Sequence, residues 1–294
     1  MSRLTLVPTP IGALHDVTLH ALEVLRDADV VAAEDTRRSA TLLQAHGIAT
    51  PLVRLDAHTV AARGPRLLAD HAHVAYVSDA GTPGISDPGA DLLRLALDAG
   101  HEVEVLPGAT AFVPALVLSG LEIARFAFEG FLPRKGSARA RRLRALAERD
   151  HPSALYEAPA RLAATLTDLA ETCGSDRPAS VSRELSKRYE ETRRGTLAQL
   201  AGHYRATPAR GECVVVVGAA PPRDEPDGPD ADARAAALAG AGVRGRTLID
   251  ALRALGVARN DAYRAALAVD PPQGEAPQDD VAIHDDARDE DGPS

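Results

Sequence analysis

A loop at residues 77–89, VSDAGTPGISDPG, carries the most chemical information in this chain. Its glycines permit positive φ angles and close approach of the backbone to a ligand, and its prolines fix the turns. Short polar side chains and free backbone N–H groups in such a loop can hold a small polar molecule. The alternative is a plain strand-to-helix connection, but a connection needs less rigid backbone than this.

Other charged or rigid segments follow expected strands. Pro8–Gly12 (PTPIG) is a stiff turn, and Glu34–Arg38 (EDTRR) sets two acids beside two arginines. The latter is also typical of a capped, salt-bridged helix start, with Asp35 or Thr36 as the N-cap. Further along, three of the four phenylalanines stand beside a basic run at 134–149, which holds seven Lys or Arg and one Glu. Aromatic and basic side chains together favour contact with bases and phosphates, although a core of phenylalanine beside a solvated helix is an equal alternative.

Bulk composition limits the possible functions. The net charge is −9, but residues 270–294 hold nine acids and one arginine, so the rest of the chain is nearly neutral and a nucleic-acid partner is not excluded. No apolar run is long enough to span a membrane, and Cys173 and Cys213 lack metal-ligand spacing. We therefore expect a cytoplasmic protein with two inert thiols. Only Lys135 and Lys187 are lysines among 33 basic residues, which suggests that these two positions require an ammonium group.

The elements that position these residues alternate between strand and helix, which predicts an α/β fold. In the first half we expect strands at 4–7, 30–33, 51–55, 73–78 and 102–106, with helices at 18–28, 37–46, 59–70, 88–99 and 110–119. This order predicts a parallel sheet covered on both faces. The loops at 8–12, 34–36, 78–88 and 107–109 should then gather at one edge of the sheet.

A second α/β set is expected from residue 121, with strands at about 125–129, 153–156, 179–183 and 212–217 and helices at about 137–149, 159–173 and 196–206. We predict five segments: an N-terminal α/β domain at 1–120, a second α/β domain at 121–220, a linker at 221–232, a small helical module at 233–269 and a disordered acidic tail at 270–294. Within the module, the helices at 247–255 and 259–269 have helix-turn-helix spacing, although a helical cap fits almost as well.

Nine segments together resemble the tetrapyrrole methylase superfamily and, within it, the bacterial small-subunit ribosomal RNA cytidine 2′-O-ribose methyltransferases. In order they are PTPIG, AEDTRRS, VSDAGTPGISDPG, LPGATA, SGL, FEGFLPRKGSAR, YEAPAR, RELSKRYEE and GECVVVVG, and they cover about residues 4–218. This chain departs from the family pattern at Ala13, at Ala160 and in the stretch Asp56–Thr59.

The resemblance implies two α/β domains with a cleft between them that binds S-adenosylmethionine, the methyl donor. It also implies a homodimer and a substrate cytidine in the decoding region of 16S ribosomal RNA, within the small ribosomal subunit. The expected donor-binding residues are Pro10, Gly12, Ser78, Asp79, Gly81, Thr82, Pro83, Gly84, Gly108, Ala109, Ser119 and Tyr156. The expected RNA-binding residues are Arg134, Lys135, Arg139, Arg141, Arg142 and Arg161.

Methyl transfer from a sulfonium to a ribose hydroxyl needs alignment of the reacting atoms and a base or a cation at the oxygen, but no metal. We expect Lys187 to be the first catalytic candidate, because burial can lower the pKa of an ammonium. Glu157, Glu184 and Asp35 are the alternatives.

Two other functions remain open. A methyltransferase acting on a corrin or sirohydrochlorin would have the same fold and donor, but it would not need the basic run or the C-terminal helices. A non-catalytic ribosome-assembly protein could use the same fold, although the loop at 77–89 is complete. A nicotinamide dehydrogenase is disfavoured, because no G-x-G-x-x-G follows the first strand.

Overall fold

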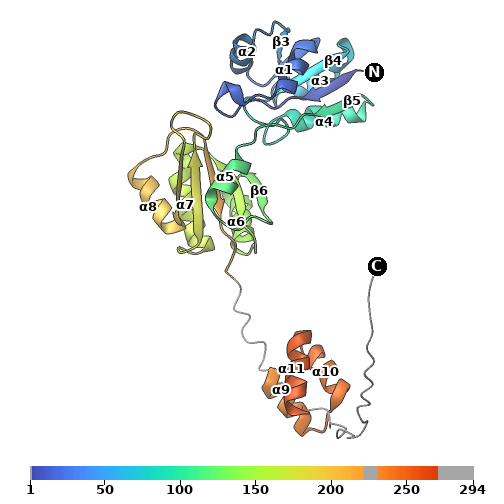
Figure 1. The fold of residues 1–294 in the computed structure, drawn as a ribbon, viewed down its shortest axis with the longest axis vertical. Helices are drawn as coiled ribbons and strands as arrows, with labels where there is room; N and C mark the ends of the chain where they lie inside the picture. Colours follow the sequence, from blue (N-terminus) through green and yellow to red (C-terminus); the bar gives the residue numbers. More distant parts are fainter. Residues whose placement is uncertain (1, 222–230, 271–294) are drawn as a thin grey trace, which may run out of the picture. The chain divides into compact units, whose positions relative to one another are not determined.

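The computed structural model describes residues 2–221 and 231–270 of the chain. The chain divides into two compact units: an α/β body that ends at Pro221, and a second unit from Pro222 that contains three helices (Figure 1). No described helix is both long and apolar enough to cross a membrane.

The first lobe of the body is a fully parallel five-stranded sheet in the order β3-β2-β4-β1-β5. Its strands are β1 (Arg3–Leu6), β2 (Val30–Ala33), β3 (Leu52–Arg54), β4 (His73–Val77) and β5 (Glu102–Val105). The prediction of a parallel sheet is confirmed. The loops that follow the strands therefore all lie at the carboxyl-terminal edge of the sheet.

Helices cover both faces of this sheet because its inner strands are apolar throughout. In β2, Val31 and Ala33 pack under α1 (Leu19–Asp27) and α2 (Thr36–Ala45), while Val30 and Ala32 face the other way. That second face is covered by α3 (Val60–Asp70) and α4 (Gly89–Asp98). A 3-10 turn, η1 (Leu14–Asp16), precedes α1, which Thr18 caps as expected by accepting the N–H of Ala21.

The second lobe is a mixed sheet in the order β6-β7-β10-β8-β9. Its strands are β6 (Ala127–Phe131), β7 (Ser153–Glu157), β8 (Pro178–Arg183), β9 (Glu191–Thr196) and β10 (Cys213–Val217). Only β6 and β7 pair in parallel, and the other neighbours are antiparallel. The helices α6 (Gly136–Ala147), α7 (Pro159–Cys173) and α8 (Leu197–Ala206) bury their apolar sides on one face.

The other face of the second sheet is covered by α5 (Phe112–Ser119), through Ala115 and Leu116. Figure 1 shows α5 beside β6, within the second lobe. The crossing between lobes therefore lies before α5, earlier than the boundary at residue 120 that we predicted. The prediction also omitted β9, whose charged sequence ETRRGT does not look like a strand but pairs along its whole length with β8.

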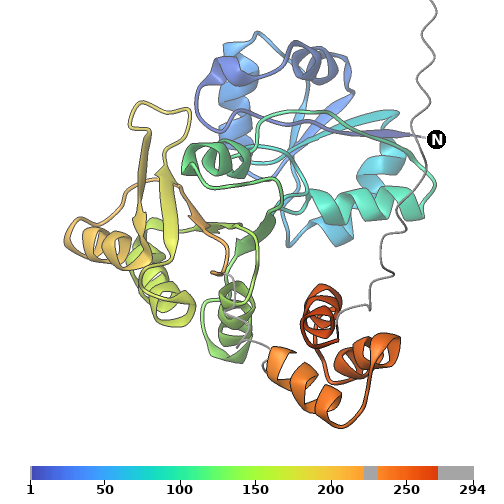
Figure 2. The same cartoon turned by 60° about the horizontal axis from the view of Figure 1, so that its bottom comes forward.

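The second unit consists of α9 (Ala231–Gly240), α10 (Gly245–Ala254) and α11 (Arg259–Val269), which pack around a core of their own (Figure 2). Leu248 and Leu252 of α10 are fully buried against small residues of α9 and α11. Of the predicted linker at 221–232, residues 231–232 belong to α9 and 222–230 lie outside the described residues. All of the predicted tail after Asp270 also lies outside them.

Candidate active site

The loops after the first-lobe strands are joined to one another by backbone and side-chain hydrogen bonds. Thr9 and Gly81 exchange backbone hydrogen bonds of 3.0 Å and 2.9 Å, which joins the loop after β1 to the loop after β4. The Thr82 hydroxyl donates to the carbonyl oxygen of Ala109 at 3.0 Å, which adds the loop after β5. The loop at 77–89 is thus the centre of the assembly, as its sequence suggested.

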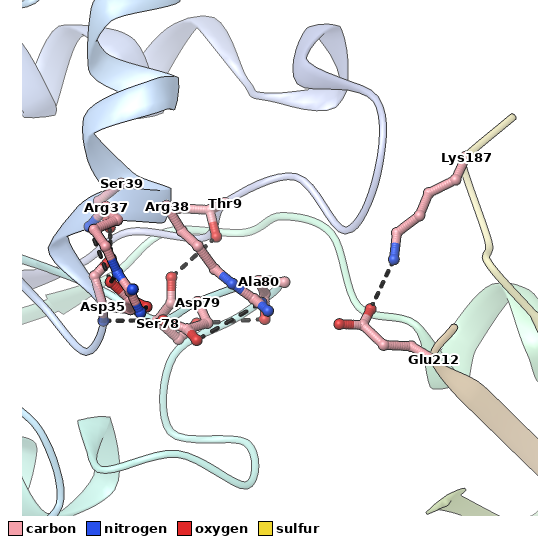
Figure 3. A network of polar contacts seen from close by, with 10 residues as sticks. All are labelled: Thr9, Asp35, Arg37, Arg38, Ser39, Ser78, Asp79, Ala80, Lys187 and Glu212. Carbon is pink, nitrogen blue, oxygen red and sulfur yellow. Dashed lines mark hydrogen bonds and ion pairs between the residues drawn. The ribbon is translucent and has the colours of Figure 1, made fainter. Parts of the chain in front are cut away.

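Asp79 joins the loop after β2 to the same assembly. Its carboxylate accepts the backbone N–H of Asp35 at 3.0 Å and lies 3.7 Å from the guanidinium of Arg38 (Figure 3). Asp35 is the N-cap of α2 and also binds Arg37, whose hydrogen bonds lower the pKa of Asp35 to about 2. Asp35 is therefore an ionised structural cap, whereas Arg38 is directed toward Asp79.

Left-handed backbone gives the loop its shape. Gly81 and Gly84 have φ angles of +83° and +92°, and Ser86 adopts +67° without being a glycine. The Asp87 carboxylate secures this path by accepting the N–H groups of Gly84 and Gly89 at 2.7–3.0 Å. The loop is consequently preorganised, with its turns fixed by internal bonds.

A cavity of about 390 Å³ lies between this loop assembly and the second sheet. That volume falls within the range of roughly 300–1,000 Å³ that is usual for small-molecule sites. The first lobe and the crossing segment contribute Ile11, Glu34, Arg38, Ser78, Asp79, Ala80, Gly81, Thr82, Ile85, Ser86, Asp87, Thr110 and Ala111 to its lining. The second lobe contributes Phe131, Tyr156, Glu157, Ala158, Pro159, Glu212, Cys213 and Val214.

Carboxylates dominate the charge of the cavity. Partial burial raises the pKa of Glu34, and the nearby charges of Asp79 and Asp87 raise it further, while Arg38 opposes them. A bound cation would stabilise the ionised carboxylates of such a cluster, because it offsets their mutual repulsion. The cavity is therefore electrostatically suited to a small cation.

Lys187 does not line the cavity, but it holds a residue that does. Its ammonium lies 3.0 Å from Glu184 and 3.1 Å from Glu212. Figure 3 shows the contact with Glu212, which is one of the residues that line the cavity. Partial burial alone would lower the pKa of Lys187, but the hydrogen bonds to both carboxylates outweigh burial and raise the pKa. Our expectation of a lowered pKa at this lysine was wrong, because we did not pair it with Glu184, three residues away, and the sequence did not reveal its distant partner Glu212. Lys187 is a cation at neutral pH.

Glu184 has a structural role beside it. Its φ is +52°, and its carboxylate accepts the N–H of Glu212 at 3.1 Å as well as the Lys187 ammonium. Burial opposes ionisation of Glu184, but these bonds outweigh it and lower its pKa. A Cβ on Gly211 would lie 2.0 Å from this carboxylate, so the glycine makes room for it.

Glu157 borders the cavity from β7 with a side chain that is 0% exposed. Its carboxylate accepts the N–H of Ala158 at 2.8 Å and the hydroxyl of Thr165 at 2.6 Å, and it lies 3.2 Å from Nε of Arg161. Arg161 also donates to the carbonyl of Leu132 at 3.0 Å. These bonds fix the start of α7 against the end of β7.

Aromatic side chains form the second-lobe wall. The Tyr156 ring contacts Phe128 and Phe131, with centroids 4.9 Å and 5.6 Å apart, and Phe112 stacks on Phe128. Burial raises the pKa of Tyr156, although hydrogen bonds from the backbone N–H groups of Phe112 and Ala111, at the start of α5, partly offset this. The wall offers a neutral, apolar surface opposite the acidic loops.

Of the expected donor-binding residues, five line the cavity: Ser78, Asp79, Gly81, Thr82 and Tyr156. The others are Pro10, Gly12, Pro83, Gly84, Gly108, Ala109 and Ser119, and they shape the loops from outside the cavity lining. A Cβ on Gly12 would meet the backbone of Ser186 at 2.5 Å, and one on Gly108 would meet Pro8 at 2.3 Å. Ser119 closes the end of α5 by donating to the carbonyl of Leu116.

Residues that the sequence prediction left out include Glu34, Arg38 and Glu212. Glu34 and Arg38 belong to the EDTRR segment, which we singled out. We did not list them as site residues, because a helix cap at Asp35 already explains the charged residues of that segment. Glu212 belongs to the GECVVVVG segment, which we used only for the family resemblance and as a buried strand. Cys213 also reaches the cavity, and burial raises the pKa of its thiol to about 11, so it stays protonated at neutral pH.

The basic run divides into two sets. Three arginines of the run form ion pairs: Arg139 with Asp168 at 2.6 Å, and Arg142 and Arg149 with Glu129. The exposed set is Arg134, Lys135, Arg141 and Arg144, whose side chains have no hydrogen bond or ion pair within the described residues. Phosphate contacts therefore fit the exposed set better than Arg139, Arg142 or Arg161.

Among residues 2–221 and 231–270, no cluster of His, Cys, Asp or Glu is arranged to hold a metal ion.

Comparison with known structures relates the α/β body to methyltransferases. A uroporphyrin-III-C-methyltransferase from Thermus thermophilus superposes with a TM-score of 0.54 at 24% identity, covering 74% of this chain and 94% of that one. A diphthine synthase gives a TM-score of 0.57 at 18% identity, covering 74% and 90%. At these identities the likeness concerns the fold alone.

Sequence comparison is more specific. Residues 3–201 match the family model of the tetrapyrrole (corrin/porphyrin) methylases. A Synechocystis protein called ribosomal RNA small subunit methyltransferase I is 45% identical over 229 residues, covering 77% of this chain and 82% of that protein. The protein of the same name from Mesorhizobium japonicum is 42% identical over 278 residues, covering 92% and 94%. The chain therefore belongs to the tetrapyrrole methylases and, among them, to the ribosomal RNA small subunit methyltransferase I family.

Proposed function

We propose that this protein transfers a methyl group from S-adenosylmethionine to the 2′-hydroxyl of a cytidine in the decoding region of 16S ribosomal RNA, within the small ribosomal subunit. The observation that carries the proposal is the acidic cavity at the carboxyl edge of the parallel sheet, in a chain whose relatives are called small-subunit ribosomal RNA methyltransferases.

The cavity fits the methyl donor in size and charge. The donor carries a sulfonium and an ammonium group, and Glu34, Asp79 and Glu212 place carboxylates on opposite walls. Tyr156 and Phe131 supply an apolar surface suited to a purine ring. We assign donor binding to Ser78, Asp79, Gly81, Thr82 and Tyr156, with the remaining predicted residues holding the loops in shape.

The proposed reaction forms a bond between the ribose oxygen and the methyl carbon while the bond from that carbon to sulfur breaks. Its electron pair goes to sulfur, which leaves S-adenosylhomocysteine, and the hydroxyl proton needs an acceptor. Glu34 suits this role, because its raised pKa brings it closer to neutrality, where a general base works best. Arg38, beside Asp79, can stabilise negative charge at the ribose oxygen.

Three of the four catalytic candidates from the sequence receive positioning roles in this proposal, and the fourth, Asp35, caps α2. Lys187 keeps its proton and positions Glu212, and Glu184 positions Lys187. Glu157 fixes the second-lobe wall through Thr165 and Arg161. All three act through their neighbours on the shape and charge of the cavity.

RNA contact is assigned to the exposed part of the basic run, at Arg134, Lys135, Arg141 and Arg144. We also propose a cytoplasmic homodimer. An apolar surface on α5 and the neighbouring Phe126 supports the dimer, since Val113 and Val117 of α5 are 47% and 65% exposed and Phe126 is 45% exposed.

The proposed function is tested by offering labelled S-adenosylmethionine with three acceptors side by side: small ribosomal subunits, naked 16S ribosomal RNA and a sirohydrochlorin. We expect label in the RNA of the subunits and none in the tetrapyrrole. Label in the tetrapyrrole alone would replace the proposal with the small-molecule reaction. Donor binding without transfer to any acceptor would favour a non-catalytic role in assembly.

A further inference from the structure

Residues 231–270 of the helical unit include six arginines, and the contacts described there divide them into two groups. Arg234 and Arg244 donate to backbone carbonyls, and Arg264 lies 3.6 Å from both Asp232 and Asp261. The other three are Arg246, Arg253 and Arg259. All three are exposed, and their side chains have no hydrogen bond or ion pair within the described part of the chain.

These three arginines line one open groove between α10 and α11. Arg246 and Arg253 are seven residues apart and so lie on the same side of α10, while Arg259 starts α11. Tyr263, one turn after Arg259, also lines the groove and is 56% exposed. The groove measures about 1,150 Å³, which is larger than the usual small-molecule site.

Acidic residues do not cancel this charge. Asp270 lines the groove, but its carboxylate lies 3.8 Å from the guanidinium of a fourth arginine, Arg244, which offsets its charge, and it also accepts the N–H of Gly245 at 2.7 Å. Asp250 is the other acid in the lining, against three unpaired guanidinium groups. The groove is therefore a basic surface with an exposed aromatic ring.

Three arginines in a row beside an exposed tyrosine match the chemistry of a nucleic-acid strand. Arginine binds phosphate oxygens in a bidentate way, and a tyrosine ring stacks on an unpaired base. The relative from Mesorhizobium japonicum aligns over 92% of this chain, more than the α/β body can account for, so it shares at least part of the helical unit. Such a unit, joined to the α/β body through one chain, would bind RNA as a second, linked contact.

We propose that the groove between α10 and α11 is a second ribosomal RNA-binding surface, in which Arg246, Arg253 and Arg259 bind phosphates and Tyr263 stacks on a base. This inference rests on the proposed function, since it takes the RNA to be the substrate.

The test measures binding of the full chain to naked 16S ribosomal RNA between 50 and 200 mM salt. The variant replaces Arg246, Arg253 and Arg259 with alanine, and a matched control replaces Arg26, Arg66 and Arg94, exposed arginines on α1, α3 and α4. The logarithm of the binding constant falls linearly with the logarithm of the salt concentration, and we call the steepness of this line the salt slope. Each of the three lost phosphate contacts should lower the salt slope by about 0.7–0.9. Over this range the parent and control should therefore lose about 20- to 40-fold more affinity than the variant.

Two further variants separate charge from stacking. Changing the three arginines to lysine should restore most of the salt slope, because lysine keeps the charge. Tyr263→Ala should weaken binding about fivefold or more without altering the slope, and Tyr263→Phe should bind like the parent. Circular dichroism and calorimetric donor affinity should match the parent in every variant.

An alanine variant with the parental affinity and salt slope would overturn the inference. A variant that binds naked RNA normally but small subunits weakly would also overturn it, because the partner would then be a ribosomal protein. Failure of the proposed function has a different signature: the parent would transfer no methyl group to the RNA of small subunits, whatever its salt slope.

Discussion

The buried carboxylate of Glu157 gives a sharp test of whether a residue at the cavity acts in the chemistry or in the architecture. Glu157→Ala removes the acceptor of the Ala158 N–H and the Thr165 hydroxyl and leaves Arg161 without its carboxylate. Removing one member of a buried ion pair costs about 3–5 kcal/mol. Arg161 is 28% exposed and keeps its bond to the Leu132 carbonyl, so the lower end, about 3 kcal/mol, applies here.

In thermal unfolding of a body of this size, 1 kcal/mol corresponds to about 2–4 °C. Glu157→Ala should therefore lower Tm by about 6–12 °C, measured by circular dichroism. Glu157→Gln keeps the shape and loses the charge, so we expect about half that effect. The control is Glu171→Ala, an exposed glutamate on α7, the helix that follows Glu157, and it should leave Tm unchanged.

Methyl transfer by Glu157→Gln at a temperature where it is folded should have kcat within a few-fold of the parent. The reasoning is refuted if Glu157→Ala keeps the parental Tm while transfer is abolished, because Glu157 would then act in the reaction itself.

Three further predictions concern charge. Burial alone would raise the pKa of Glu129, but its bonds to Arg149 and Arg142 outweigh burial and lower the pKa. A lowered carboxyl pKa stabilises the fold at neutral pH, and this effect is lost as the pH falls toward the folded-state pKa. Glu129→Gln should therefore lower Tm at pH 7 and lower it by less at pH 3. An equal Tm difference at both pH values would contradict this account. The pKa of Glu34 is raised in the folded protein, so its ionised form destabilises the fold above about pH 4.3. Glu34→Gln should therefore raise Tm at pH 7. The same variant should lower kcat by about 10²–10⁴ if Glu34 is the base. Parental turnover in that variant would remove Glu34 from the mechanism. Replacing Arg134, Lys135 and Arg141 with alanine should lower the RNA salt slope by about 2 and leave donor affinity unchanged, and an unaltered slope would make this surface a solvated helix face.

Local sequence signals predicted the first lobe well because apolar periodicity and caps act over a few residues. Thr18 caps α1 as expected, and the strand ends that bring the loops together follow from parallel order alone. The placement of α5 was missed because its apolar sequence would suit either sheet. The strand β9 was missed because hydrogen bonding to β8, and not burial, holds its charged residues in place.

The candidate site shows the same division between local and distant information. The loop at 77–89 is visible in the sequence because its backbone chemistry is local. The contact of Lys187 with Glu212 is not, since Glu212 lies 25 residues away. The hydrogen bonds of Lys187 to Glu184 and Glu212 together reverse the expected direction of its pKa shift. Arg139 likewise belongs to a basic run in sequence but binds Asp168, 29 residues further on. Which charges are free and which are paired is settled only by the fold.

The central claim is that the cavity directs a methyl group to a ribose oxygen of a cytidine in 16S ribosomal RNA. The most direct measurement is mass spectrometry of nucleosides from unmethylated small subunits, after incubation with the protein and S-adenosylmethionine. We predict 2′-O-methylcytidine in the decoding region, approaching one methyl per subunit, and its loss with Asp79→Ala. A methyl group on a base, on another nucleoside, or in no RNA at all would contradict the account.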